Sequence, residues 1–132
     1  MNSDLQALFG NLAEQERIKG HHSAEGRAIR TLSRALSGWS SSQLHATDVL
    51  TLSFQAVEDW LKARLQVSPW AKTSRSELLA EASEKKLISV MDAVKFQRIR
   101  NLLSPTAPTA DLTRQRVEEA LIFCIHLVEQ HW

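Results

Sequence analysis

Apolar residues recur every three or four positions along most of the chain, the spacing that places side chains on one face of an α-helix. The pattern is clearest over residues 47–66, which we predict to form a central core helix. Its apolar positions lie four, three, four and four residues apart, at Leu50, Phe54, Val57, Leu61 and Leu65. On the outer face of this helix, Glu58 and Lys62 have the four-residue separation that favours a surface ion pair.

Residues that start and stop helices give the limits of the others. Gly20 would end a first helix, and Ser37-Gly38 a second. Ser74 can cap the helix that follows it, in a capping box completed by Glu77. The predicted helices cover about residues 3–19, 23–36, 47–66, 74–86 and 89–104, with a last one from about Thr113. We predict a polar linker that starts at Trp39, and an extended loop with two prolines over 104–111. β-branched residues, glycine and proline are sparse, so we predict an all-α fold: an antiparallel bundle of four long helices with one or two additional short helices.

Two of these helices contain most of the residues that bear on function. In the helix over 89–104, which Pro105 would end, one face is apolar and another is polar. We predict that Val94, Ile99, Leu102 and Leu103 point inward, and that the residues pointing outward or into a groove are Lys95, Arg98 and Asn101. The last helix has an apolar face wide enough to pack on both the core and a partner. This face comprises Val117, Leu121, Cys124 and Val128, widened by Ile122, Ile125 and Trp132.

The composition is that of one soluble globular domain over residues 1–132. The chain is 43% hydrophobic and 23% charged, which argues against disorder, and its length suits one core. A single cysteine, Cys124, excludes an intrachain disulfide and fits the reducing cytoplasm. The N-terminus lacks the basic and apolar pattern of a secretory signal, and the longest apolar stretch is too short to span a bilayer. We therefore expect a cytoplasmic protein that has no membrane partner.

Neither a metal nor a cofactor is predicted. His21 and His22 are adjacent, so their side chains would diverge by about 100° on a helix, and no third ligand follows at a useful spacing. We interpret them as part of an exposed turn. Glu58 and Asp59 are also adjacent and do not converge as a catalytic pair of carboxylates.

The net charge of +1 identifies no class of partner, but the charges are unevenly distributed. Between Ala93 and Arg116 there is one acid, Asp111, against five basic residues: Lys95, Arg98, Arg100, Arg114 and Arg116. Such a patch can attract phosphate groups. It can equally be a solvated helix face, with Arg100 paired to Asp111 or Glu118 and Asn101 satisfying backbone groups at the helix end.

The order of several short motifs resembles that of the HEPN superfamily. The motifs are Val57-Glu58-Asp59-Trp60-Leu61-Lys62, Ser74-Arg75-Ser76-Glu77-Leu78-Leu79, Lys86-Leu87-Ile88-Ser89, Phe96-Gln97-Arg98-Ile99-Arg100-Asn101 and Val117-Glu118-Glu119-Ala120-Leu121. The resemblance covers about residues 24–131, and the helix over 3–19 lies outside that core. It implies an α-helical bundle that forms a homodimer. An arginine-polar dipeptide, here Arg100-Asn101, would face a cleft between the protomers.

The chain departs from this family at one residue that its active members need. In those members a histidine follows the arginine after four to six intervening residues, and the pair cleaves RNA without a metal. Here Pro105, Thr106 and Ala107 occupy those positions after Arg100. Histidine accepts a proton near neutral pH, and serine or threonine hydroxyls do not replace it as a base. The next histidine, His126, lies in the last predicted helix and could approach Arg100 only through the tertiary fold.

Three hypotheses about function follow. The first is a non-catalytic HEPN-like interaction module, a homodimer that binds a protein partner, or RNA, through an arginine-lined groove. Its binding residues would be Lys95, Arg98, Arg100, Asn101 and Arg114. The second is a metal-independent ribonuclease of the toxin-antitoxin or defence type with a displaced histidine, in which Arg100 and His126 would be catalytic. The third is a helical transcriptional regulator that acts through a partner, since no helix-turn-helix is evident.

Overall fold

The computed structural model describes residues 3–67, 73–103 and 112–130, and within them it contains α-helices, one short 3₁₀ helix and no strand. The elements are α1 (Ser3–Lys19), α2 (Ala24–Ser40), α3 (Ala46–Arg64), α4 (Arg75–Glu84), α5 (Val90–Arg100), η1 (Asn101–Leu103) and α6 (Arg114–Glu129). The all-α class predicted from the sequence is confirmed. None of the helices in this part of the chain combines the length and the apolar character needed to cross a membrane. The loop predicted over 104–111 and the predicted packing of Trp132 lie outside the described residues.

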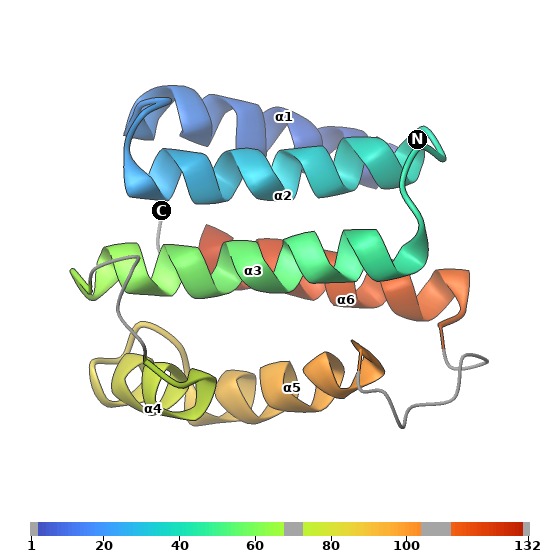
Figure 1. The fold of residues 1–132 in the computed structure, drawn as a ribbon. Helices are drawn as coiled ribbons and strands as arrows, with labels where there is room; N and C mark the ends of the chain where they lie inside the picture. Colours follow the sequence, from blue (N-terminus) through green and yellow to red (C-terminus); the bar gives the residue numbers. More distant parts are fainter. Residues whose placement is uncertain (1–2, 68–72, 104–111, 131–132) are drawn as a thin grey trace.

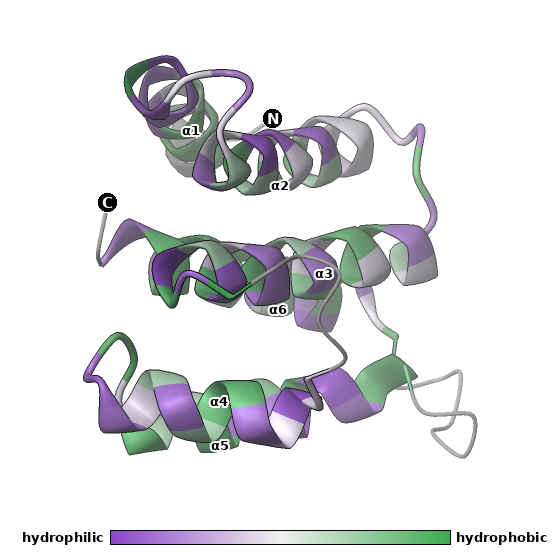
Figure 2. Ribbon diagram, turned by 60° about the vertical axis from the view of Figure 1, so that its left-hand side comes forward, coloured by the Kyte–Doolittle hydropathy of each residue, from purple (hydrophilic) through white to green (hydrophobic). Residues whose placement is uncertain are grey.

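The helices lie in three layers (Figure 1). Helices α3 and α6 form the middle layer, with α1 and α2 on one side and α4 and α5 on the other. Figure 2 shows the same layers from a second direction, with hydrophobic and hydrophilic turns alternating along the helices, as expected where one face is buried. The buried side chains form one hydrophobic cluster. Its largest fully buried members include Trp60, Phe54, Phe96, Leu121 and Ile125.

Four helices begin at residues whose side chains accept hydrogen bonds from the first turn. Ser23 caps α2 by accepting from the backbone N–H of Gly26 at 2.9 Å. Ser74 accepts from the backbone N–H of Glu77 at 3.2 Å, and Ser89 accepts from that of Asp92 at 3.0 Å. Thr113 caps α6 in the same way. These bonds satisfy N–H groups that have no partner within the helix. The helix starts predicted at these residues are confirmed.

The second helix is longer than predicted. The expectation that Ser37-Gly38 would end it is wrong, because α2 continues to Ser40. Gly38 is buried, and a Cβ atom built on it would lie 2.4 Å from Cδ1 of Leu44. The glycine therefore permits the close approach of Leu44 and does not end the helix. Trp39, predicted to lie in a linker, is a buried residue of α2.

Helix α5 joins the core through a residue that the apolar pattern did not identify. Val94, predicted to point inward, is 51% exposed. Phe96 is buried instead, and its ring meets that of Phe54 on α3 edge-on, with 5.7 Å between the centroids. The prediction fails at Val94 because the face of α5 toward α3 carries Phe96 and Arg100, four residues apart. The other residues predicted to point inward are half-buried: Ile99, Leu102 and Leu103.

Candidate functional site

A groove of about 650 Å³ lies between α5 and α6, and we call it the α5–α6 groove. Its basic, titratable or acidic side chains are Lys95, Arg98, Arg116, Glu119 and His126. Its apolar side chains include Ile99, Leu102, Ile122 and Phe123. The apolar residues are half-buried and the charged ones are exposed. The groove therefore has an apolar floor and a charged rim.

The helical repeat explains why these residues meet. On α5, Lys95 and Ile99 are four positions apart and share one face of the helix. On α6, Glu119, Phe123 and His126 follow one another after four and three positions, which again selects one face. The two faces border the groove from opposite helices.

The rim has more basic than acidic side chains. Nζ of Lys95 lies 4.6 Å from the centroid of the Phe123 ring, a cation–π contact across the groove. Arg98 is exposed and forms no ion pair with any residue that the structure describes. Nδ1 of His126 lies 2.8 Å from Oε2 of Glu129 in the last turn of α6. A ligand carboxylate or phosphate can thus bind Arg98 without first displacing a carboxylate of the described chain.

Arg100 does not line this groove and instead packs against α3. Its Nη2 lies 3.4 Å from Oε2 of Glu58, and its Cζ lies 5.4 Å from the centroid of the Phe54 ring. Burial lowers the pKa of Arg100, while the charge of Glu58 opposes that shift. Glu58 is buried and also accepts a hydrogen bond from Nε of Arg75 at 2.7 Å. The surface ion pair predicted between Glu58 and Lys62 is therefore wrong.

Of the two acids predicted as partners of Arg100, Asp111 lies outside the described residues, and Glu118 has other partners. Glu118 forms an ion pair with Arg114, with 3.2 Å between Oε1 and Nε, and accepts a hydrogen bond of 3.2 Å from the indole N–H of Trp39. The Arg114 guanidinium lies over the Trp39 ring, 5.0 Å from its centroid. Arg114 therefore joins α6 to α2.

The structure thus separates the residues predicted to form one site. Those that line the α5–α6 groove are Lys95, Arg98 and His126, and those that do not are Arg100, Asn101 and Arg114. Asn101 is exposed at the C-cap of α5. Of the apolar floor, Ile99, Leu102 and Ile122 were predicted to lie on the apolar faces of their helices, whereas Phe123 was not identified from the sequence. Phe123 could have been identified from its three-residue spacing to His126, which places both residues on one face of α6.

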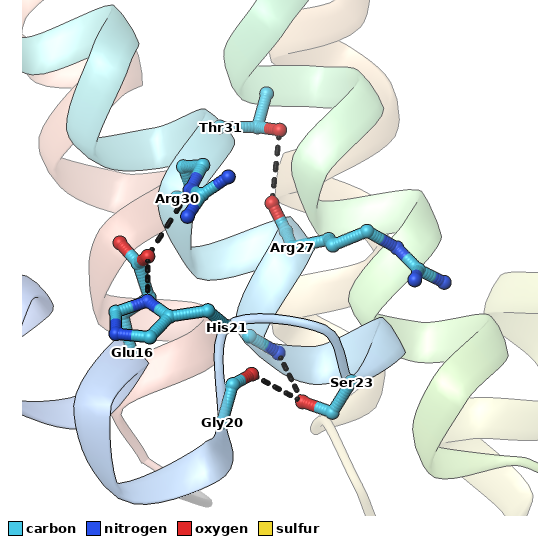
Figure 3. Close-up of polar contacts among 8 residues, drawn as sticks. Glu16, Gly20, His21, Ser23, Arg27, Arg30 and Thr31 are labelled. Atoms are coloured by element: carbon cyan, nitrogen blue, oxygen red, sulfur yellow. Dashed lines mark hydrogen bonds and ion pairs between the residues drawn. The ribbon is translucent and has the colours of Figure 1, made fainter.

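A second polar cluster attaches α1 to α2 (Figure 3). Nδ1 of His21 lies 2.6 Å from Oε2 of Glu16, and Nε of Arg30 lies 3.1 Å from the same oxygen. Among the described residues, no three histidine, cysteine, aspartate or glutamate side chains gather as a metal ion would require. The cluster therefore acts as a contact between helices.

The α5–α6 groove offers charge and apolar surface, with one imidazole on its rim. His126 supplies this imidazole, and the described lining contains no cysteine, serine or threonine that could act as a nucleophile beside it. Comparisons with known proteins find no family model, no curated protein and no solved structure that matches the chain. Its function must therefore be inferred from the chemistry of this groove.

Proposed function

We propose that the protein is a non-catalytic, HEPN-like interaction module of the cytoplasm: an antiparallel bundle of four long helices that forms a homodimer and binds a partner protein through the α5–α6 groove. The observation that supports this function best is the apolar floor beneath a rim with more basic than acidic side chains. The ligand is an amphipathic segment with apolar side chains on one face and carboxylates beside them. This is helix-in-groove recognition.

Each part of such a segment has a counterpart in the groove. Its apolar side chains would cover Ile99, Leu102 and Phe123, gaining about 25 cal/mol for each Å² of apolar surface removed from water. Its carboxylates would approach Arg98, whose planar guanidinium can bind both oxygens of one carboxylate. The positive rim would also speed the encounter with an acidic segment, an effect that salt weakens.

The position of Arg100 favours binding over catalysis. This is the arginine that the resemblance assigns to RNA cleavage, yet its guanidinium is held between Glu58 and Phe54 and does not border the groove. His126, the residue that could complete a catalytic pair, borders the groove without it. An arginine that packs α5 against α3 has a structural role, and this role does not require a neighbouring histidine.

Fluorescence anisotropy with labelled helical peptides tests the proposed groove. One peptide carries leucine and glutamate at helical spacing, and a second replaces each glutamate by lysine. We expect saturable binding of the acidic peptide alone, weakened by about tenfold or more in Arg98→Glu. Arg34→Glu is the matched control, because Arg34 is an exposed arginine of α2 that does not border the groove. Equal binding of the two peptides, or equal weakening by the two variants, would contradict the proposal.

Light scattering at the same protein concentrations tests the homodimer separately. We expect a molar mass near twice the 14.9 kDa of one chain. A monomeric mass would contradict the homodimer, whereas the binding role of the groove is tested by the peptide titrations alone.

The second candidate is a metal-independent ribonuclease of the toxin or defence type, and the placement of His126 favours it. His126 is exposed on the groove with Lys95 and Arg98, so its imidazole can accept a proton from a ribose 2′-hydroxyl while the cations bind phosphate. RNA is incubated in EDTA with the wild type, His126→Ala and Arg100→Ala. Cleavage by the wild type that is lost in His126→Ala supports the ribonuclease. The absence of any cleavage supports the interaction module.

A further inference from the structure

A second hollow, of about 690 Å³, lies between α2 and α3 and shares no residue with the α5–α6 groove. Small side chains border it from both helices: Ala24 and Ala28 on α2, and Ala63 on α3. Their methyl groups leave space between the helices that larger side chains would fill. The hollow therefore has apolar walls that a flat organic group can contact.

Two cations from different helices also border this hollow, Arg27 from α2 and Lys62 from α3. Figure 3 shows that Arg27 and Arg30, neighbours on α2, point in different directions: Arg30 reaches Glu16, whereas Arg27 extends toward α3. Nη1 of Arg27 donates to the carbonyl oxygen of His22 at 2.8 Å. The other N–H groups of this guanidinium remain for a ligand.

The carboxylates near Arg27 on α1 and α2 bind other cations. Glu16 of α1 accepts a bond of 3.1 Å from Arg30. Glu25, two residues before Arg27, lies 3.3 Å from Nζ of Lys19. Arg27 itself forms no ion pair with any residue of the described ranges 3–67, 73–103 and 112–130. Its charge is thus balanced by none of these side chains.

The wall formed by α3 adds a second unpaired cation and one acid. Lys62, too, has no ion pair within the described part of the chain. Asp59 borders the hollow one turn earlier, and its Oδ1 accepts a hydrogen bond from Nε2 of Gln55 at 2.9 Å. Two cations therefore face the hollow with one carboxylate, which leaves it with net positive charge.

We propose that this hollow binds a phosphate ester. The phosphate of a monoester has up to two negative charges near neutral pH and three acceptor oxygens. Arg27 can bind two of these oxygens in the plane of its guanidinium, and Lys62 supplies the second positive charge. The alanine walls receive the organic part of the ester, and Asp59 can accept a hydrogen bond from it. The phosphate belongs either to a small phosphorylated molecule or to the backbone of a nucleic acid, and the same contacts would recognise both.

Amide NMR shifts of the full chain test this site. The probes are adenosine 5′-monophosphate, adenosine as the uncharged control, and a short RNA oligonucleotide without terminal phosphates. We expect saturable shifts over 24–31 and 59–67 with the monophosphate and none with adenosine. Displacement of the monophosphate by the oligonucleotide would identify a backbone phosphate as the natural ligand. Saturable binding of the monophosphate without displacement would identify a small phosphomonoester.

Matched variants separate a built site from general attraction between charges. Arg27→Gln and Lys62→Gln each remove one proposed contact, and each is expected to weaken binding of the monophosphate by about tenfold. Arg34→Gln is expected to leave binding unchanged, because Arg34 is exposed on the same helix but does not border the hollow. Thermal unfolding by circular dichroism checks that all three variants keep the fold. The absence of saturable shifts up to about 10 mM probe, or equal weakening by all three variants, would overturn the proposal.

Discussion

Glu58 on α3 and Arg100 on α5 form an ion pair in which Oε2 lies 3.4 Å from Nη2, and their side chains remain only 12% and 21% exposed. The same carboxylate accepts a shorter bond, 2.7 Å long, from Arg75 on α4. One carboxylate therefore connects three helices. Charged groups are costly to remove from water unless they are paired, so each member of this cluster depends on the others.

Replacing Glu58 by glutamine is expected to destabilise the fold by about 3 kcal/mol, because Arg75 and Arg100 would keep their charges and lose their common partner. Urea unfolding followed by circular dichroism measures the loss. Asp59→Asn is the control, since Asp59 is the next residue of α3 and its carboxylate is hydrogen-bonded to Gln55. We expect the control to change the free energy of unfolding by less than about 0.5 kcal/mol. Equal losses in the two variants would show that the cluster does not hold the three helices together.

Cys124 is expected to resist thiol reagents in the folded protein. Its side chain is fully buried in α6, and this burial raises the pKa of the thiol, although Arg100 works against the shift. The reactive thiolate is therefore scarce and shielded. With an aromatic disulfide reagent we expect slow labelling of the native protein, at the rate at which it unfolds, and immediate labelling in denaturant. Fast labelling without denaturant would contradict the packing of α6.

The apolar face of α3 could be predicted from the sequence, but the role of its polar residues could not. All five apolar positions of its repeat are buried: Leu50, Phe54, Val57, Leu61 and Leu65. Their spacing defines one face, and such a face is stable only against the core. Glu58 was assigned to the surface because Lys62 follows one turn later. Its actual partners, Arg75 and Arg100, lie 17 and 42 residues away in the chain, and only the packing of α4 and α5 on α3 brings them to it.

For the candidate site, too, the charge could be predicted from the sequence, but the placement of the side chains could not. The clustering of basic residues in the sequence predicted that α5 would be positively charged. Which of them face α6 and which face α3 depends on the rotation of α5 about its axis. That rotation is set by the contact between Phe96 and Phe54, which places Arg100 against α3 and leaves Lys95 and Arg98 on the groove. A single sequence contains no signal for this contact, because its two rings come from separate helices.

The attachment of α1 to α2 is expected to weaken in acid. Desolvation alone would raise the pKa of Glu16, but hydrogen bonds from His21 and Arg30 outweigh it and hold this pKa below its ordinary value of 4.5. A carboxylate with a depressed folded-state pKa stabilises the fold above its unfolded-state pKa, and that contribution is lost as the pH falls through the folded-state value. Glu16→Gln should therefore be less stable than the wild type at neutral pH, and the difference should shrink below about pH 4.5. Urea unfolding over a pH series measures it, and a difference that is constant with pH would contradict the role of the carboxylate.

Gly26, in the first turn of α2, lies against the turn that joins α1 to α2. A Cβ atom on it would lie 2.0 Å from the carbonyl oxygen of Gly20, which has a φ of +92°. Because the obstacle is backbone, we expect Gly26→Ala to destabilise the protein by about 2 kcal/mol or more. Gly10→Ala is the matched control within α1, since the added Cβ would meet no described atom within 4 Å other than its chain neighbours and the nearby backbone of its own helix. The higher helix propensity of alanine should stabilise the protein by about 0.5–1 kcal/mol. Thermal unfolding measures both signs, and a Gly26→Ala variant as stable as the wild type would show that the turn can move to accept a methyl group.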